Sequence, residues 1–267
     1  MKLSTQLNKN FAQYFWNSLP CIFQKNISLF LSVLYSTPIS KFFISPFARR
    51  YNMSSEELLK YAPGSGGQTY RSFQDFFTRQ LISPMTPDHA RIYPCEGLVC
   101  ESGQISEMNQ VNVKGQWHTV RKIFGGFADQ IPDSHFFINI FLHNHNYHRF
   151  HAPVTGVIKS LQYIPGQLNF LRPWLYAIEQ VSEPAFVNER VVLEIEDEDR
   201  QSWFLTFVGG MSVGKIKLHD KILAGANLQC GEEIGLFLLG STCCIAVPTK
   251  SKKIKFLSKV KVGDPIC

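Results

Sequence analysis

The texture of the chain changes near residue 92, and this change limits the fold more than any other feature. From there to the C-terminus, short apolar runs alternate with Gly, Pro, Asn and Asp. Runs of this length, bounded by turn-forming residues, are typical of β-strands. The clearest runs span residues 98–100, 136–142, 157–163, 191–195, 204–208 and 243–247. We therefore expect one β-rich domain over residues 86–267.

Residues 1–85 have the pattern of short helices. Ser54 followed by Glu57 has the spacing of a capping box, which starts a helix. Segment 71–81 places apolar residues at helical spacing and is predicted to form a helix that ends before Pro84. The Gly- and Pro-containing segment 62–67 separates these two helices. The predicted fold class is α+β, with an N-terminal helical region followed by the β-rich domain.

Charge is distributed unevenly along the chain. The net charge at pH 7 is +6, and no Asp or Glu precedes Glu56. Six basic residues do precede it: Lys2, Lys9, Lys25, Lys41, Arg49 and Arg50. From Lys250 onward six lysines accompany one acid, Asp264, so residues 56–249 are net acidic. Basic ends favour anionic lipid headgroups as partners. Nucleic acid is not expected as a partner, because no recognition motif accompanies the charge.

The N-terminal region has the features of no standard targeting segment. Its longest uncharged stretch, residues 26–40, contains Pro38. This stretch is too short for a membrane-spanning helix, which needs about 20 apolar residues. The first residues are too polar for a secretory signal. A mitochondrial presequence is rich in Arg, whereas the first Arg of this chain is Arg49. Two interpretations remain: helices that lie in a membrane interface, or helices that pack on the β-rich domain as ordinary core. We expect region 1–85 to be basic and membrane-interfacial.

Cysteine and histidine usage argues against a metal site. The seven cysteines are odd in number and form no CxxC pair, so we expect reduced thiols in a cytoplasmic setting. Four histidines lie within nine residues: His143, His145, His148 and His151. No carboxylate or thiol lies among them to complete a ligand set, and the spacing is not that of HExxH. We expect no metal here; partly exposed loop histidines are the simplest interpretation of the cluster by itself.

Two motifs, about ninety residues apart, change that interpretation. Residues 147–153 read Tyr-His-Arg-Phe-His-Ala-Pro, and residues 239–242 read Leu-Gly-Ser-Thr after an apolar run. Together they match the two diagnostic motifs of the phosphatidylserine decarboxylase family, which the chain resembles in order over nearly its whole length. The other segments that agree are 73–81 with the family's FF-x-R-x-L, 188–191 with N-E-R-V, 208–216 with V-G-A-x-x-V-G-x-I, and 262–266 with its closing strand.

The resemblance implies a decarboxylase that makes its cofactor from its own backbone. Loss of CO2 from an amino acid leaves an electron pair on carbon, and ordinary side chains cannot accept it. A ketone can accept these electrons once it has formed a Schiff base with the substrate amine. By the resemblance, Ser241 attacks the carbonyl of Gly240, the chain is cut between these residues, and Ser241 becomes a covalent pyruvoyl group. The products would be a β chain, 1–240, and an α chain, 241–267.

The resemblance also assigns roles to individual residues. A serine hydroxyl is a weak nucleophile without a neighbouring base. That base is implied to be His151, and His148 is implied to transfer a proton during decarboxylation, whereas His143 and His145 have no counterpart. The family's third partner is an aspartate, but this chain has Glu96 in a Pro-Cys-Glu-Gly segment. We expect Glu96 to orient His151 as the carboxylate of a Ser-His-Asp triad does, although its extra methylene departs from the family.

The function implied is that of a peripheral enzyme on the cytoplasmic side of a bacterial cell membrane. It would convert phosphatidylserine, presented in an anionic membrane, into phosphatidylethanolamine and CO2. The sequence leaves the oligomeric state open, with a homodimer among the alternatives. The alternatives are a relative that decarboxylates a free amino acid, and an unprocessed lipid-binding remnant, which the substitution at Glu96 suggests. A denaturing gel separates the remnant from both enzymes, because only a processed chain gives a band smaller than full length.

Overall fold

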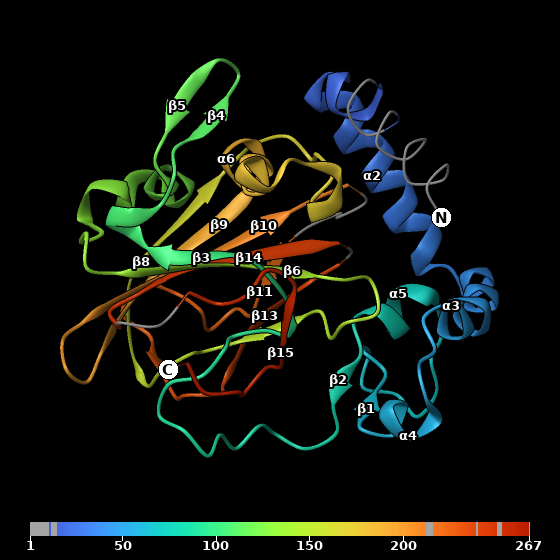
Figure 1. Ribbon diagram of the computed structural model, residues 1–267. Coiled ribbons are helices and arrows are strands. Elements are labelled where there is room, and N and C mark those ends of the chain that lie inside the picture. The colour runs from blue at the N-terminus through green and yellow to red at the C-terminus, as the bar shows by residue number, and fades with distance from the viewer. Residues whose placement is uncertain (1–10, 12–14, 212–215, 239, 250–252, 267) are drawn as a thin grey trace.

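The apolar runs after residue 92 pair as antiparallel strands in a computed structural model, which describes residues 11, 15–211, 216–238, 240–249 and 253–266 (Figure 1). The largest sheet has eight strands in the order β12-β8-β9-β10-β14-β6-β3-β15. These strands are β3 (Gly97–Gln104), β6 (Phe136–Leu142), β8 (Gly156–Ile164), β9 (Arg190–Asp197), β10 (Ser202–Gly209), β12 (Asn227–Leu228), β14 (Ser241–Val247) and β15 (Ser258–Val260). The α+β fold class is thereby confirmed, and five predicted runs correspond closely to β6, β8, β9, β10 and β14.

A second sheet packs on one face of the first. It has three strands, β11 (Ile216–Leu218), β13 (Glu233–Phe237) and β7 (Arg149–His151), in the order β11-β13-β7. Phe150 of β7 stacks on Phe207 of β10, with ring centroids 3.7 Å apart, and Phe237 of β13 joins them in the same buried cluster. The motif that carries His148 and His151 is thus anchored through Phe150 in the core between the two sheets.

The other face of the large sheet is covered by helical turns and loops. These are η4 (Ile105–Glu107), η5 (Val120–Gln130), η6 (Pro173–Leu175), η7 (Ile178–Gln180) and α6 (Glu183–Val187), and a hairpin of β4 (Val111–Val113) and β5 (Gln116–His118) extends beyond them. β14 is therefore buried on both sides: Cys243 belongs to the core facing the small sheet, and Cys244 to the core on this face. Burial on both faces explains why this strand is a continuous apolar run.

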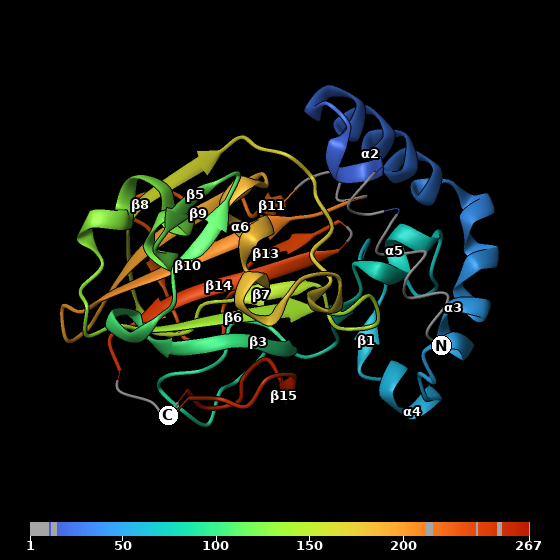
Figure 2. The same ribbon diagram turned by 45° about the horizontal axis from the view of Figure 1, so that its top comes forward.

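The N-terminal region forms helices that gather beside one end of the large sheet (Figures 1 and 2). They are η2 (Trp16–Ser18), α2 (Cys21–Ser36), η3 (Pro38–Phe43), α3 (Ile44–Arg50), α4 (Ser55–Leu58) and α5 (Phe73–Phe77). The predicted cap is confirmed, since the Ser54 hydroxyl accepts a hydrogen bond from the Glu57 amide at 3.0 Å. α5 buries Phe73, Phe76 and Phe77 in an aromatic cluster with residues of α2 and α3. Residues 1–10 and 12–14 of the expected membrane-interfacial region lie outside the described residues.

The helix predicted over 71–81 is shorter than expected. α5 ends at Phe77, and β2 (Gln80–Leu81) pairs instead with β1 (Tyr61–Ala62). The buried side chain of Arg149 explains the break, because its Nε and Nη2 donate to the carbonyl of Thr78 at 3.0 and 2.8 Å. A tertiary contact to a distant strand thus overrides the local helical spacing.

α2 is oriented with its polar side inward. Its buried residues are Gln24 and Ser28, and Gln24 accepts from the Leu168 amide at 2.9 Å and donates to the Trp16 carbonyl at 2.9 Å. The large apolar side chains of α2 and η3 are exposed: Ile22, Phe23, Ile27, Leu29, Phe30, Val33, Leu34, Ile39, Phe42 and Phe43. Among the described residues no single helix is long and apolar enough to cross a bilayer; α2 and segment 38–50 reach that length and composition only as a pair bent by 83°.

Candidate active site

Ser241 is the first residue of the central strand β14. Its backbone pairs with Leu142 of β6 on one side and Gly209 of β10 on the other, and its side chain is buried. Gly240, just before it, has φ +25°, a conformation that disfavours a side chain with a Cβ atom. The carbonyl of Leu238 accepts from the side chain of Gln74 on α5. The sheet and α5 therefore hold the segment on either side of the expected cleavage site, although Leu239 itself lies outside the described residues.

The imidazole of His148 faces the hydroxyl of Ser241. Its Nδ1 lies 3.1 Å from Ser241 Oγ, and its Nε2 lies 3.1 Å from the carbonyl oxygen of His143. Because a carbonyl only accepts, Nε2 carries the hydrogen and Nδ1 is left to accept from the serine. The ring stacks on Phe77, with centroids 4.0 Å apart, and is fully buried. Burial, with a smaller contribution from the charge of Arg79, lowers the pKa of His148 to about 3. His148 is thus a neutral hydrogen-bond acceptor at Ser241.

The structure places His151 against partners other than Ser241. Its Nδ1 donates to the carbonyl of Gly231 at 2.8 Å, and its Nε2 lies 3.2 Å from the hydroxyl of Tyr147. On β7, His151 pairs with Glu233 of the small sheet, and burial lowers the pKa of its imidazole. The reason is geometric: His148 precedes β7 in a turn that reaches β14, whereas His151 at the end of β7 is held by the small sheet.

Glu96 does not contact His151 among the described residues and instead holds the turn before His148. Its Oε1 accepts from Asn146 Nδ2 at 2.8 Å and from the Tyr147 amide at 2.7 Å. Asn146 Oδ1 in turn accepts from the His143 amide at 2.7 Å. Glu96 therefore fixes the turn that presents His148, and the longer side chain reaches the backbone of that turn.

Two buried arginines hold the backbone around this site. Arg79 Nη2 donates to the carbonyls of His145 and Asn146 at 2.7 and 3.1 Å. Arg149 forms an ion pair with Glu233 at 2.6 Å while it holds the end of α5. Sequence reasoning assigned neither arginine a role, although both lie inside segments that resemble the family's motifs. The sequence signal that could have identified them was an arginine inside each of these motif segments.

The rings of His143 and His145 pack against each other at the edge of the site, with centroids 4.6 Å apart and planes tilted by 45°. Tyr51 contacts both rings, and Trp174 contacts His143. Burial lowers the pKa of His143 to about 4, so both rings act as uncharged aromatic packing at neutral pH. The four-histidine cluster thus divides into a pair of rings packed together, one imidazole at Ser241 and one in the small sheet.

A cavity of about 510 Å³ opens on Ser241 and Gly240. Most of the lining residues are apolar. They come from the helical region as well as from the β-rich part of the chain. The lining residues are Phe11, Tyr35, Phe47, Arg50, Tyr51, Phe73, Phe77, Phe141, Asn144, Phe170, Leu171, Arg172, Gly210, Met211, Gly240 and Ser241. Its size suits a small organic ligand. Segments 1–85 and 86–267 both contribute to this cavity, so neither alone would form it.

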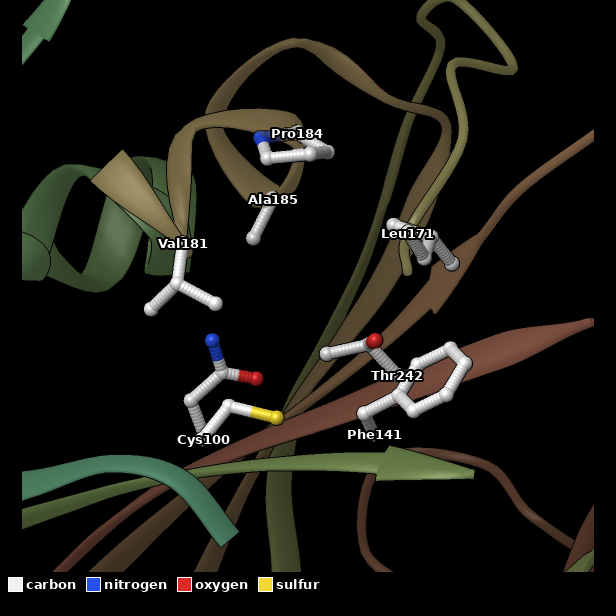
Figure 3. A pocket seen from close by; sticks show the side chains of 8 residues that line it. Cys100, Phe141, Leu171, Val181, Pro184, Ala185 and Thr242 are labelled. Carbon is white, nitrogen blue, oxygen red and sulfur yellow. The ribbon is translucent and has the colours of Figure 1, made fainter. Parts of the chain in front are cut away.

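A much smaller void lies next to Thr242, the residue after Ser241 (Figure 3). Its volume of about 10 Å³ could hold at most one water molecule. Val181, Ala185 and Cys100 close it, and Phe141 and Leu171 line both this void and the large cavity. The void is too small for a substrate, so of these two spaces the large cavity is the one that can bring a ligand to Ser241.

Comparison with known proteins identifies the chain. The sequence model of the phosphatidylserine decarboxylase family matches residues 73–267. A phosphatidylserine decarboxylase proenzyme of Brevibacillus brevis is 28% identical over 264 residues, which cover 91% of each chain. A proenzyme of the same name from Chromobacterium violaceum is 31% identical over 245 residues, which cover 84% of each chain. The chain therefore belongs to the phosphatidylserine decarboxylase family, a family of carboxy-lyases.

Proposed function

We propose that this chain cuts itself between Gly240 and Ser241 and, with a pyruvoyl group made from Ser241, converts phosphatidylserine into phosphatidylethanolamine and CO2. The distance of 3.1 Å between His148 Nδ1 and Ser241 Oγ carries the proposal. Family membership and the proenzyme names of the relatives support it. They do not favour a free amino acid as the substrate or an inactive remnant.

Self-cleavage follows from the groups around Ser241. His148 Nδ1 accepts the hydroxyl proton while Oγ attacks the Gly240 carbonyl carbon, as in other serine–histidine pairs. The peptide C–N bond breaks, the nitrogen of residue 241 takes a proton, and an ester joins Gly240 to the serine oxygen. His148, not His151, is the base in this scheme, because only His148 lies at Ser241 among the described residues. β-Elimination then removes the Cα proton of residue 241 and expels the Gly240 carboxylate, which frees the α chain. Water hydrolyses the resulting dehydroalanine to the pyruvoyl group with loss of ammonia. The α chain stays bound through β14, which pairs with β6 and β10.

The residues present fit a pyruvoyl group at position 241. The cavity opens on this position, and Phe77 and Phe141 are among the apolar side chains that line it. When formed, the group supplies the electron sink that decarboxylation needs. His148 Nδ1 faces the same position and can hold or deliver a proton there. Asn144, Arg50 and Arg172 provide the polar part of the cavity lining.

The outward apolar side of α2 and η3 supports a peripheral membrane location. Side chains such as Phe30 and Phe42, 67% and 82% exposed, stand in a region without acidic residues. A helix of this kind lies in the interface, with its apolar side among acyl chains and basic residues near anionic headgroups. A core helix would have the opposite orientation. We place this surface on the cytoplasmic leaflet of a bacterial cell membrane, where the cavity would receive a lipid headgroup.

A gel of the purified protein tests the proposal. The wild-type chain should give a fragment of residues 1–240 and one of 241–267, the second with a blocked N-terminus whose mass fits a pyruvoyl group. Ser241→Ala should stay uncut, at about the full 30.5 kDa, and should not release CO2 from phosphatidylserine. A wild-type protein that decarboxylates while uncut would overturn the proposal.

A further inference from the structure

The large cavity contains two arginines whose charges are not neutralised by any ion pair among the described residues. Arg50 comes from the last turn of α3, and Arg172 from the loop before η6. Arg172 lies over the ring of Phe170, 5.9 Å from its centroid, and Phe170 contacts Phe11 of the N-terminal segment. Both arginines therefore stand among aromatic side chains, where an unpaired guanidinium is a strong anion-binding group.

The neighbours of Ser241 in the cavity lining are apolar side chains. Phe77 stacks on His148, which contacts Ser241, and Phe141 lies on β6 opposite Thr242. These neighbours are apolar and offer no cation to the reacting end of a substrate. The cavity lining thus combines apolar neighbours of Ser241 with two arginines.

The apolar and the cationic parts of the cavity lining match the two anionic groups of phosphatidylserine. The carboxylate loses its charge when CO2 leaves, so an arginine bound to it would stabilise the substrate more than the transition state. The phosphodiester keeps its charge throughout, and its oxygens match the donor geometry of guanidinium groups. Given the proposed reaction at Ser241, we infer that Arg50 and Arg172 bind the phosphodiester of the substrate while the carboxylate lies against Phe77 and Phe141.

Binding of a soluble product lipid tests this assignment without any need for the cofactor. In the uncut Ser241→Ala chain, calorimetry measures the dissociation constant of dihexanoyl phosphatidylethanolamine, which has a phosphodiester and no carboxylate. Adding Arg172→Gln or Arg50→Gln should weaken binding by about tenfold or more, the size expected for a lost charge-assisted hydrogen bond. Arg71→Gln removes an exposed arginine outside the cavity and should leave the dissociation constant unchanged.

A second probe separates the phosphodiester from the carboxylate. O-hexanoyl-L-serine keeps the amine and the carboxylate but has no phosphate. The Arg172→Gln and Arg50→Gln enzymes should process this compound as wild type does, while KM for dihexanoyl phosphatidylserine rises and kcat changes little. Equal losses on both compounds would assign the arginines to the carboxylate and overturn the inference.

Failure of this inference differs from failure of the proposed function. If the wild-type chain cleaves and decarboxylates, but both arginine variants bind dihexanoyl phosphatidylethanolamine as tightly as the Ser241→Ala parent, the phosphodiester site is refuted alone. If the wild-type chain neither cleaves nor decarboxylates while the arginine variants still lose affinity for the lipid, the proposed reaction is refuted and the phosphodiester site stands.

Discussion

At the scale of the residue, the identity of the base is set by which imidazole nitrogen reaches Ser241. His148 Nδ1 does, and His151 is held by Gly231 and Tyr147. We predict that His148→Ala remains uncut or cleaves at least about 10²-fold more slowly, the usual contribution of a general base. His151→Ala should cleave within about tenfold of wild type. Time courses on denaturing gels measure both rates.

Thermal unfolding of the two histidine variants is the control, because each ring is buried and hydrogen-bonded. A folded His151→Ala that does not cleave, beside a His148→Ala that does, would restore the assignment implied by the family resemblance.

Glu96 allows a sharper test of how the turn before His148 is held. Both of its hydrogen bonds, from Asn146 and from the Tyr147 amide, end on the same oxygen, Oε1. A carboxamide oxygen can accept the same two bonds. We therefore predict that Glu96→Gln cleaves within about tenfold of wild type, and that Glu96→Ala slows cleavage by about 10²-fold through misplacement of His148.

Glu96→Asp should also be slow, since the shorter side chain withdraws the oxygen by roughly 1 Å. The competing hypothesis, a carboxylate that stabilises an imidazolium directly, requires the charge. It would be supported if Glu96→Gln lost activity by orders of magnitude, as triad carboxamides do.

At the scale of the element, α2 exposes the side chains that a soluble helix would bury. We predict that Phe30→Ser weakens sedimentation with anionic vesicles by more than about tenfold, because transfer of a phenylalanine side chain from water contributes about 2 kcal/mol. Self-cleavage should not change, since Phe30 does not line the cavity. Leu223→Ser removes a side chain of similar exposure, 63%, on the β-rich body and should bind vesicles as wild type does. Unchanged sedimentation of Phe30→Ser would show that this face does not bind the membrane.

The elements also show where sequence patterns suffice and where they do not. The strand run at 243–247 was predictable, because burial on both faces leaves only apolar residues. The length of α5 was not, because Arg149 ends it from a strand about seventy residues away. The sequence also did not show which side of α2 faces inward, because Gln24 finds its hydrogen-bond partners in a loop far along the chain. The spacing of apolar residues reflects local burial. The end of α5 and the orientation of α2 depend instead on long-range hydrogen bonds.

The same limit applies to the candidate site. The motifs identified His148, His151, Glu96 and Ser241, and the structure brings His148 and Ser241 into contact. Which histidine reaches the serine could not be read from spacing, because the answer depends on a turn whose geometry Glu96 and Arg79 fix from two other segments.

At the scale of the whole molecule, buried histidines couple stability to pH. Burial lowers the pKa of His135, His143, His145, His148 and His151 below that of a free imidazole. The unfolded chain therefore binds more protons than the folded chain once the pH falls below about 6.5. Their contribution to stability is fully present above that pH and is lost progressively as the pH falls toward the folded pKa values. The direction is the same for all five. Burial raises the pKa of Glu101 to about 7 and also raises that of Glu183, so these two carboxyls partly offset the histidines as the pH falls.

We predict that the melting temperature of the uncut Ser241→Ala chain falls between pH 7 and pH 5. For His148, with a folded pKa of about 3, the free energy of unfolding should drop by about 2 kcal/mol over this interval, and the less buried histidines add smaller amounts. Calorimetric melting curves at several pH values measure the loss. The base itself stays neutral over the same interval, so initial rates of self-cleavage in the wild-type chain should be nearly equal at pH 7 and pH 5. A cleavage rate that falls with a midpoint near pH 6.5 would show that the acting imidazole is solvated, and would contradict the assignment of buried His148 as the base.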